Sequence, residues 1–117
     1  MGPMAFSVDT EGSVVVARAR GDMWGKPEDT GLKTEFASLA GSGHRRFIID
    51  FDGISAINST GIGIVVSCLT EVQAEGGRLR LCNLNKRIRS TFEVTGLSKM
   101  LSFYGTVESA VARPWPK

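Results

Sequence analysis

The segment 55–66 constrains the fold of this chain more than any other. A strand is expected to lead into it and to end just short of Asn58, and a helix is expected to begin there. Asn58, Ser59 and Thr60 are residue types that cap helices, and an apolar pattern with helical spacing starts at Ile62. The first N–H groups of a helix lack internal partners and carry partial positive charge. A hydroxyl at this turn is therefore placed where a phosphate would be stabilised.

The rest of the chain alternates between strand and helix patterns. Strands are predicted at 4–8, 13–19, 46–51, 78–83 and 101–104. Helices are predicted at 27–40, 60–75, between the cap Asn85 and Gly96, and after the cap Thr106. The turn formers at 9–12 predict a hairpin at the sheet edge. The order predicts an α/β fold with a small mixed, mostly parallel sheet of about four to five strands, flanked by about four helices.

Composition narrows the class of protein. A chain of 117 residues is expected to form one domain, at 4–113, followed by a tail at 114–117. Residues 1–3 resemble residues left by cloning. The net charge of +2 is too small to imply nucleic acid. No run is apolar enough for a membrane span and no signal peptide opens the chain, so a cytoplasmic protein is expected.

Two apolar patterns predict which side chains are buried. The helix at 60–75 presents its main apolar face through Ile62, Val65, Val66, Leu69 and Val72. Ile64 and Cys68 lie on a different face, so they are expected to be at least partly exposed and to mark a partner site.

Cys68 and Cys82 have no metal-ligand spacing and are expected to be reduced thiols inside apolar elements. Arg78 and Arg80 alternate with leucines, which predicts a strand with one polar face.

Four segments carry a resemblance to a known family. The segments 47–51, 57–63, 76–79 and 92–97 resemble the STAS domain of anti-sigma-factor antagonists. The resemblance implies a small sheet flanked by helices, and a protein that binds and is modified without catalysis of its own. It also implies an anti-sigma factor as partner, usually a serine kinase as well, whose binding releases a sigma factor in bacterial transcription. The kinase would phosphorylate the serine that opens the helix, here Ser59, and a PP2C-type phosphatase would reverse this.

The resemblance also suggests a partner surface around Ser59. Many family members have aspartate where this chain has Asn58, and asparagine caps a helix about as well but lacks the charge. The residues expected at this surface are Asp22, Asp52, Asn58, Ser59, Thr60, Gly61, Ile62, Gly63, Ile64 and Cys68.

Plainer interpretations remain open for several of these residues. Ser59 could be an unmodified N-cap, and Thr60 a first-turn hydroxyl or a secondary phosphorylation site. Asp22 and Asp52 could be simple loop residues, although we favour a place beside Ser59. The two glycines at 61 and 63 are a weak nucleotide-loop signal and more plausibly admit another backbone at close range.

Trp24, which follows the second predicted strand, either packs against the first helix or anchors a partner, and we favour packing. Asp50 and Asp52 resemble a metal pair, but no third ligand is evident, so neither a metal nor a cofactor is expected.

Two hypotheses of function follow. The first is a phosphorylation-switched binding module that regulates a sigma factor and exists as a monomer or weak dimer. The second is a STAS-type module that is never phosphorylated and serves another assembly, transport-associated or ligand-binding. An enzyme has little support, because the sequence shows no catalytic triad, metal cluster or cofactor fingerprint.

Overall fold

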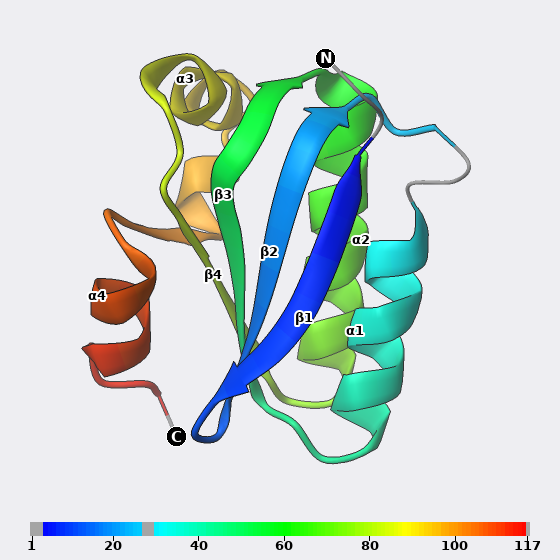
Figure 1. The fold of residues 1–117 in the computed structure, drawn as a ribbon, viewed down its shortest axis with the longest axis vertical. Helices are drawn as coiled ribbons and strands as arrows, with labels where there is room; N and C mark the ends of the chain where they lie inside the picture. Colours follow the sequence, from blue (N-terminus) through cyan, green and yellow to red (C-terminus); the bar gives the residue numbers. More distant parts are fainter. Residues whose placement is uncertain (1–3, 27–29, 117) are drawn as a thin grey trace.

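A computed structural model describes residues 4–26 and 30–116 as five strands, four α-helices and one 3₁₀ helix (Figure 1). In chain order they are β1 (Ala5–Glu11), β2 (Val14–Met23), α1 (Gly31–Gly41), β3 (Arg46–Ile57), α2 (Ser59–Ala74), β4 (Arg78–Cys82), α3 (Lys86–Val94), η2 (Leu97–Lys99), β5 (Ser102–Tyr104) and α4 (Val107–Ala112). The order matches the prediction. The helical turn predicted at residues 27–29 lies outside the described residues.

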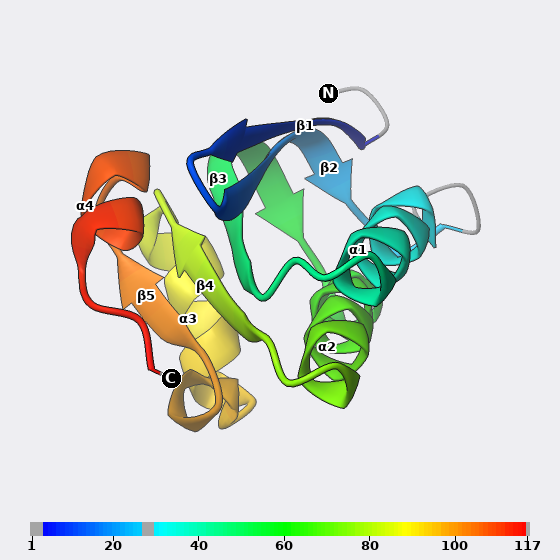
Figure 2. The same cartoon turned by 90° about the horizontal axis from the view of Figure 1, so that it is seen from below.

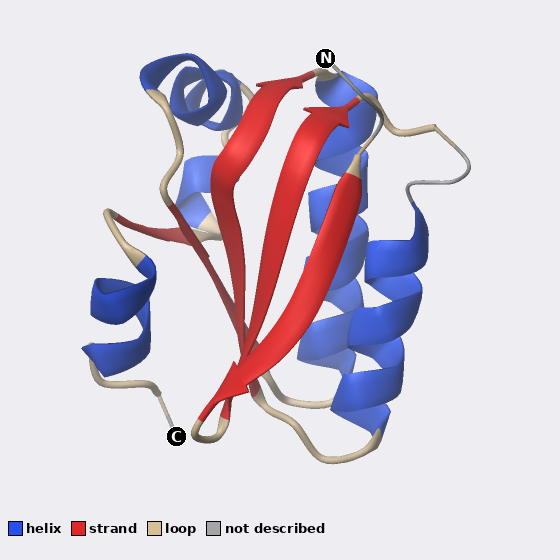
Figure 3. Cartoon of the chain, in the orientation of Figure 1, coloured by secondary structure: helices blue, strands red, loops and turns tan. Residues whose placement is uncertain are grey.

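The strands form one sheet in the order β1-β2-β3-β4-β5 (Figure 3). β1 pairs antiparallel with β2 at the edge, and the other pairs are parallel. The predicted mixed, mostly parallel α/β sheet with an edge hairpin is therefore confirmed. β2 runs beyond its predicted end, because register shifts near Gly21 let the strand continue through a residue type that usually breaks strands.

The helices cover the two faces of the sheet unequally. α1, α2 and α3 lie on one face and α4 lies on the other (Figure 2). The larger core is filled from β3 by Phe47 and Phe51, whose rings meet Phe36 of α1 and Phe92 of α3 at centroid distances of 4.9 and 6.1 Å. This core fixes the end of β3 and the start of α2.

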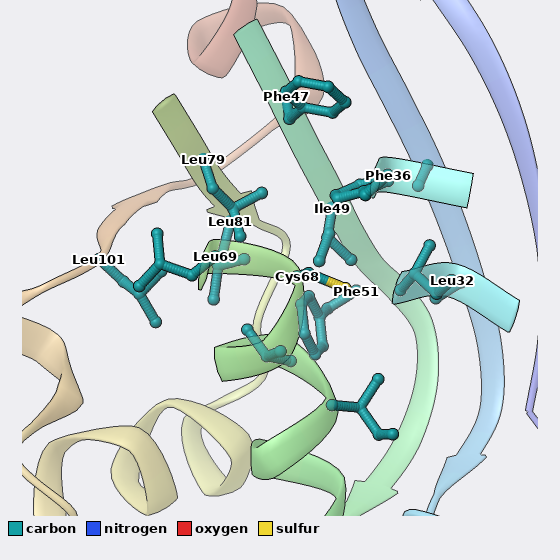
Figure 4. Packing of buried hydrophobic residues seen from close by; sticks show 14 of the residues in the cluster. Leu32, Phe36, Phe47, Ile49, Phe51, Cys68, Leu69, Leu79, Leu81 and Leu101 are labelled. Atoms are coloured by element: carbon teal, nitrogen blue, oxygen red, sulfur yellow. The ribbon is translucent and has the colours of Figure 1, made fainter. Parts of the chain in front are cut away.

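The predicted exposure of Ile64 and Cys68 is wrong. Ile64 is 8% exposed and Cys68 is fully buried. The reason is that α2 is enclosed on two sides, by the sheet and by α1, so its apolar surface is wider than one stripe. Figure 4 shows the Cys68 sulfur among the side chains of Phe51 and Leu32. Cys68 and Cys82 are both free and buried, as predicted.

The predicted polar face of β4 is also only half right. Arg78 is exposed, but Arg80 is 5% exposed because α4 and the residues after it cover that face. Its guanidinium donates to the carbonyls of Ala110, Arg113 and Pro114 at 2.8, 2.9 and 2.6 Å. The same group lies 3.7 Å from the ring centroid of Trp115 and 4.8 Å from that of Tyr104. Arg80 thus ties the C-terminal segment to the sheet.

Candidate functional site

The turn between β3 and α2 is closed by Asn58. Its backbone is extended, and its side-chain oxygen accepts a hydrogen bond from the N–H of Gly61 at 2.7 Å. Its carbonyl accepts the N–H of Ile62 at 2.9 Å, the first helical bond. Asparagine at this position satisfies a donor that the helix cannot, and Ser59 is the first helical residue instead of the cap.

Ser59 is exposed, as a place at a partner surface requires. Among residues 4–26 and 30–116, no hydrogen bond engages its hydroxyl, nor the backbone N–H of Ser59 or Thr60. The first turn of α2 holds no acidic side chain. Within the described part of the chain, two unbonded N–H donors thus adjoin a hydroxyl that makes no hydrogen bond, at the positive end of a helix. Such an environment favours a phosphate.

The end of β2 is pressed against this first turn. The carbonyl of Met23 accepts the N–H of Asn58 at 3.4 Å and touches Gly61, where a Cβ would overlap it. The loop continues through Gly25, whose φ of +74° suits glycine and which lies against Thr60. Close backbone approach, expected for the glycines at 61 and 63, is therefore confirmed for Gly61. For Gly63 the same expectation is wrong as far as this chain's own backbone is concerned, because an added Cβ there would meet nothing within 4 Å.

A polar cluster of Asp50, Asn83 and Arg18 lies at the C-terminal end of β4. The carboxylate of Asp50 accepts the N–H of Asp52 at 3.0 Å and the side-chain amide of Asn83 at 2.8 Å. Arg18 lies 4.0 Å from its other oxygen. Asn83 has a φ of 58°, a left-handed conformation that asparagine tolerates. The Asp50 side chain therefore connects β3 to the residue that follows β4. Among the described residues, no group of three or more His, Cys, Asp or Glu side chains could hold a metal ion.

Burial divides the predicted partner surface. Asp22 (9% exposed), Gly61, Ile62, Ile64 and Cys68 are buried and offer a partner little or no surface. Ile62 belongs to the larger hydrophobic core, and Gly61 lies against the Met23 carbonyl. The exposed members are Asp52, Asn58, Ser59, Thr60 and Gly63.

The two predicted carboxylates, Asp22 and Asp52, lie on the strands that lead to the turn, and their place beside Ser59 stays a prediction. Asp22 lies in register with Ala56 of β3, and the backbone of Asp52 is bound to Asp50. Among the described residues, no hydrogen bond or ion pair joins either carboxylate to Ser59. Trp24, for which we favoured packing against the first helix, is one of the exposed large apolar side chains of the described residues, at 38%. It directly precedes Gly25, which lies against Thr60.

The thiols of Cys68 and Cys82 both have raised pKa values. Burial raises the pKa of the Cys68 thiol to about 12. Burial, with the nearby Asp50 carboxylate, raises the pKa of the Cys82 thiol to about 12 as well. Neither sulfur is therefore ionised near neutral pH, which makes both thiols poor nucleophiles. Within the described part of the chain, no helix has the length and apolar character to span a membrane.

Comparisons with known proteins agree with the fold described above. The STAS domain family model matches residues 5–110. The anti-sigma-B factor antagonist of Bacillus subtilis is 34% identical over 58 residues, which are 50% of this chain and 53% of the relative. The phosphorylated form of SpoIIAA, a Bacillus cell fate determinant, superposes with a TM-score of 0.71 at 25% identity, covering 93% of this chain and 98% of the other.

A more distant likeness concerns the fold alone. The murine anion transporter Slc26a9 contains a region that superposes with a TM-score of 0.71 at 15% identity, over 85% of this chain and 17% of the transporter. The family match spans almost all of the described residues and both edges of the sheet. This chain belongs to the STAS domain family.

Proposed function

We propose that this protein is an anti-sigma-factor antagonist that binds an anti-sigma factor with serine kinase activity and thereby releases a sigma factor. Phosphorylation of Ser59 by that kinase ends the association, and a PP2C-type phosphatase restores it. The protein acts in the cytoplasm as a monomer or weak dimer and catalyses nothing itself. The relatives support this role through their names: one is an anti-sigma-B factor antagonist and another is a determinant solved in phosphorylated form.

The exposed hydroxyl of Ser59 carries the proposal. Ser is common at helix starts because it caps them, but here Asn58 makes the capping bond. The hydroxyl is therefore available to a kinase without loss of any hydrogen bond among the described residues. A phosphate adds close to two negative charges, which the free N–H groups tolerate but an apolar or acidic partner surface does not.

The alternative is a STAS module in another assembly, such as a transporter, that is never phosphorylated. The fold cannot separate the two roles, because the transporter region and SpoIIAA superpose equally well on this chain. The state of Ser59 in the cell separates them.

The test begins with the full chain as bait in a lysate of its native cell, with mass spectrometry of both the captured proteins and Ser59. Recovery of an anti-sigma factor is then followed by titration calorimetry with the purified factor. Ser59→Ala is expected to bind it as tightly as the unmodified protein and to resist its kinase activity, whereas Ser59→Asp is expected to bind weakly. Thr60→Ala is the matched control, because it removes the neighbouring hydroxyl and should still be phosphorylated at Ser59.

Two results would count against the proposal. If Ser59→Ala and Ser59→Asp bind with equal affinity, charge at this position is not the switch. If no anti-sigma factor is recovered and Ser59 is unmodified under every growth condition, the second hypothesis takes its place.

A further inference from the structure

The two tryptophans of this chain have opposite surroundings. Trp115 is half-buried, donates its indole N–H to the carbonyl of Val111 at 3.2 Å, and stacks on the Arg80 guanidinium. Trp24 is 38% exposed, and within residues 4–26 and 30–116 no hydrogen bond or ring contact engages it. An indole combines a large apolar surface with one donor, so an exposed and unbonded one is suited to a binding partner.

The backbone on both sides of Trp24 is held against the first turn of α2. Before it, the Met23 carbonyl accepts the Asn58 N–H and touches Gly61. After it, Gly25 lies against Thr60. Trp24 therefore adjoins the turn that presents Ser59, on a backbone that contacts α2 before and after it. A backbone already held against the helix has less conformational entropy to lose when a partner binds there.

Gly63 provides an independent observation on the same helix. It is exposed and lies one turn after Ser59, so the two residues share a face. An added Cβ would meet nothing within 4 Å, so this fold does not need a glycine there. Glycine inside a helix is destabilising relative to alanine, because it loses more backbone freedom on folding. Bare backbone at an exposed helix position lets another molecule approach more closely than a side chain would.

We propose that Trp24 is the aromatic anchor of the surface that binds the anti-sigma factor, and that the factor's chain lies directly on the α2 backbone at Gly63. This inference rests on the proposed function. It specifies the partner's chemistry: an apolar pocket for the indole with an acceptor for its N–H, and small side chains opposite Gly63. A second copy of this chain fits the surface less well, because a symmetric dimer here would bring two positive helix ends together.

The experiment measures affinity and stability separately, by titration calorimetry with the anti-sigma factor recovered above and by thermal melting. Trp24→Ala is expected to weaken binding at least about tenfold with little change in melting temperature, and Trp24→Phe to fall between. Gly63→Ala is expected to raise the melting temperature and yet weaken binding, a combination that a purely structural role would not produce. Val94→Ala and Met100→Ala are matched controls, because both side chains are apolar and exposed but lie at the end of α3 and after η2.

The outcomes separate the two proposals. If the unmodified protein does not bind the anti-sigma factor, the proposed function fails and this surface fails with it. If the unmodified protein binds but Trp24→Ala and Gly63→Ala bind equally well, this inference alone is overturned. If instead Trp24→Ala abolishes a concentration-dependent dimer in sedimentation and leaves the factor's affinity unchanged, the surface belongs to a second copy and the inference is again overturned.

Discussion

Replacing Arg80 with methionine should destabilise this domain while leaving its surface nearly unchanged. The substitution keeps an apolar stem of similar length but removes a guanidinium that makes three hydrogen bonds of 2.6–2.9 Å and faces two aromatic rings. Charged hydrogen bonds contribute about 1.5–3 kcal/mol each, and each cation–π contact adds about 0.5–2 kcal/mol. These gains are partly offset by dehydration of the charge, which is also why burial lowers the pKa of Arg80.

The net effect is smaller than the gross sum. Two of the three carbonyls belong to the exposed residues Arg113 and Pro114, which water can reach once the guanidinium is gone. We therefore expect Arg80→Met to lower the free energy of unfolding by about 2–4 kcal/mol, which corresponds to a melting temperature lower by roughly 8–15 °C. Trp115 fluorescence should shift to the red before global unfolding, because the C-terminal segment loses its attachment.

Arg78→Met is the matched control. Arg78 lies two residues earlier on the same strand, is exposed, and among the described residues makes no side-chain hydrogen bond or ion pair. Its replacement should change stability by no more than about 0.5 kcal/mol. Melting temperatures for the two variants within about 2 °C of each other would show that the contacts of Arg80 contribute no net stability, and the reasoning above would be refuted.

Three further predictions concern the site and its helix. Asn58→Ala should cost about 0.5–2 kcal/mol in urea unfolding, whereas Ser59→Ala should cost less than about 0.5 kcal/mol, because only Asn58 makes the capping bond. Ile64→Glu should lower stability by at least about 3 kcal/mol or prevent folding, since it places a carboxylate in the core. Iodoacetamide at pH 8 should label Cys68 and Cys82 only after denaturant is added, and stability should fall as pH rises above about 9, because the thiols then ionise in the unfolded chain alone.

Local signals in the sequence predicted most of the element order. Asn85 and Thr106 cap α3 and α4 through the hydrogen bonds that their types suggested, to Ile88 and Ser109. Gly96 ends the α3 region with a φ of 78°, as a glycine after a helix commonly does. These features depend on residues within one turn of each other, so a sequence contains everything needed to identify them.

Features that depend on distant segments were predicted less well. The side of α2 that carries Ile64 and Cys68 looked free because nothing in its own sequence shows that α1 covers it. Arg80 looked solvated because strand alternation assigns a residue to a face but not to what lies above that face. The sequence located the turn before α2 and the position of Ser59 at its start. It offered three residues of suitable type for the N-cap, Asn58, Ser59 and Thr60, and did not show which one makes the capping bond. The choice between them is made by geometry, which puts Asn58 in extended backbone.

The use of Asn58 as the N-cap, in place of Ser59, has a consequence for regulation. A switch that alters a residue needed by the fold would change stability each time it acts. Here Asn58 caps the helix, Gly61 fits the Met23 carbonyl, and the Ser59 hydroxyl is bonded to nothing in the described chain. A phosphate on Ser59 would add a favourable interaction with the helix end, of about 0.3–1 kcal/mol per charge, without removing one. Phosphorylation of Ser59 could therefore lower the affinity for a partner without breaking any of the contacts that hold this turn together.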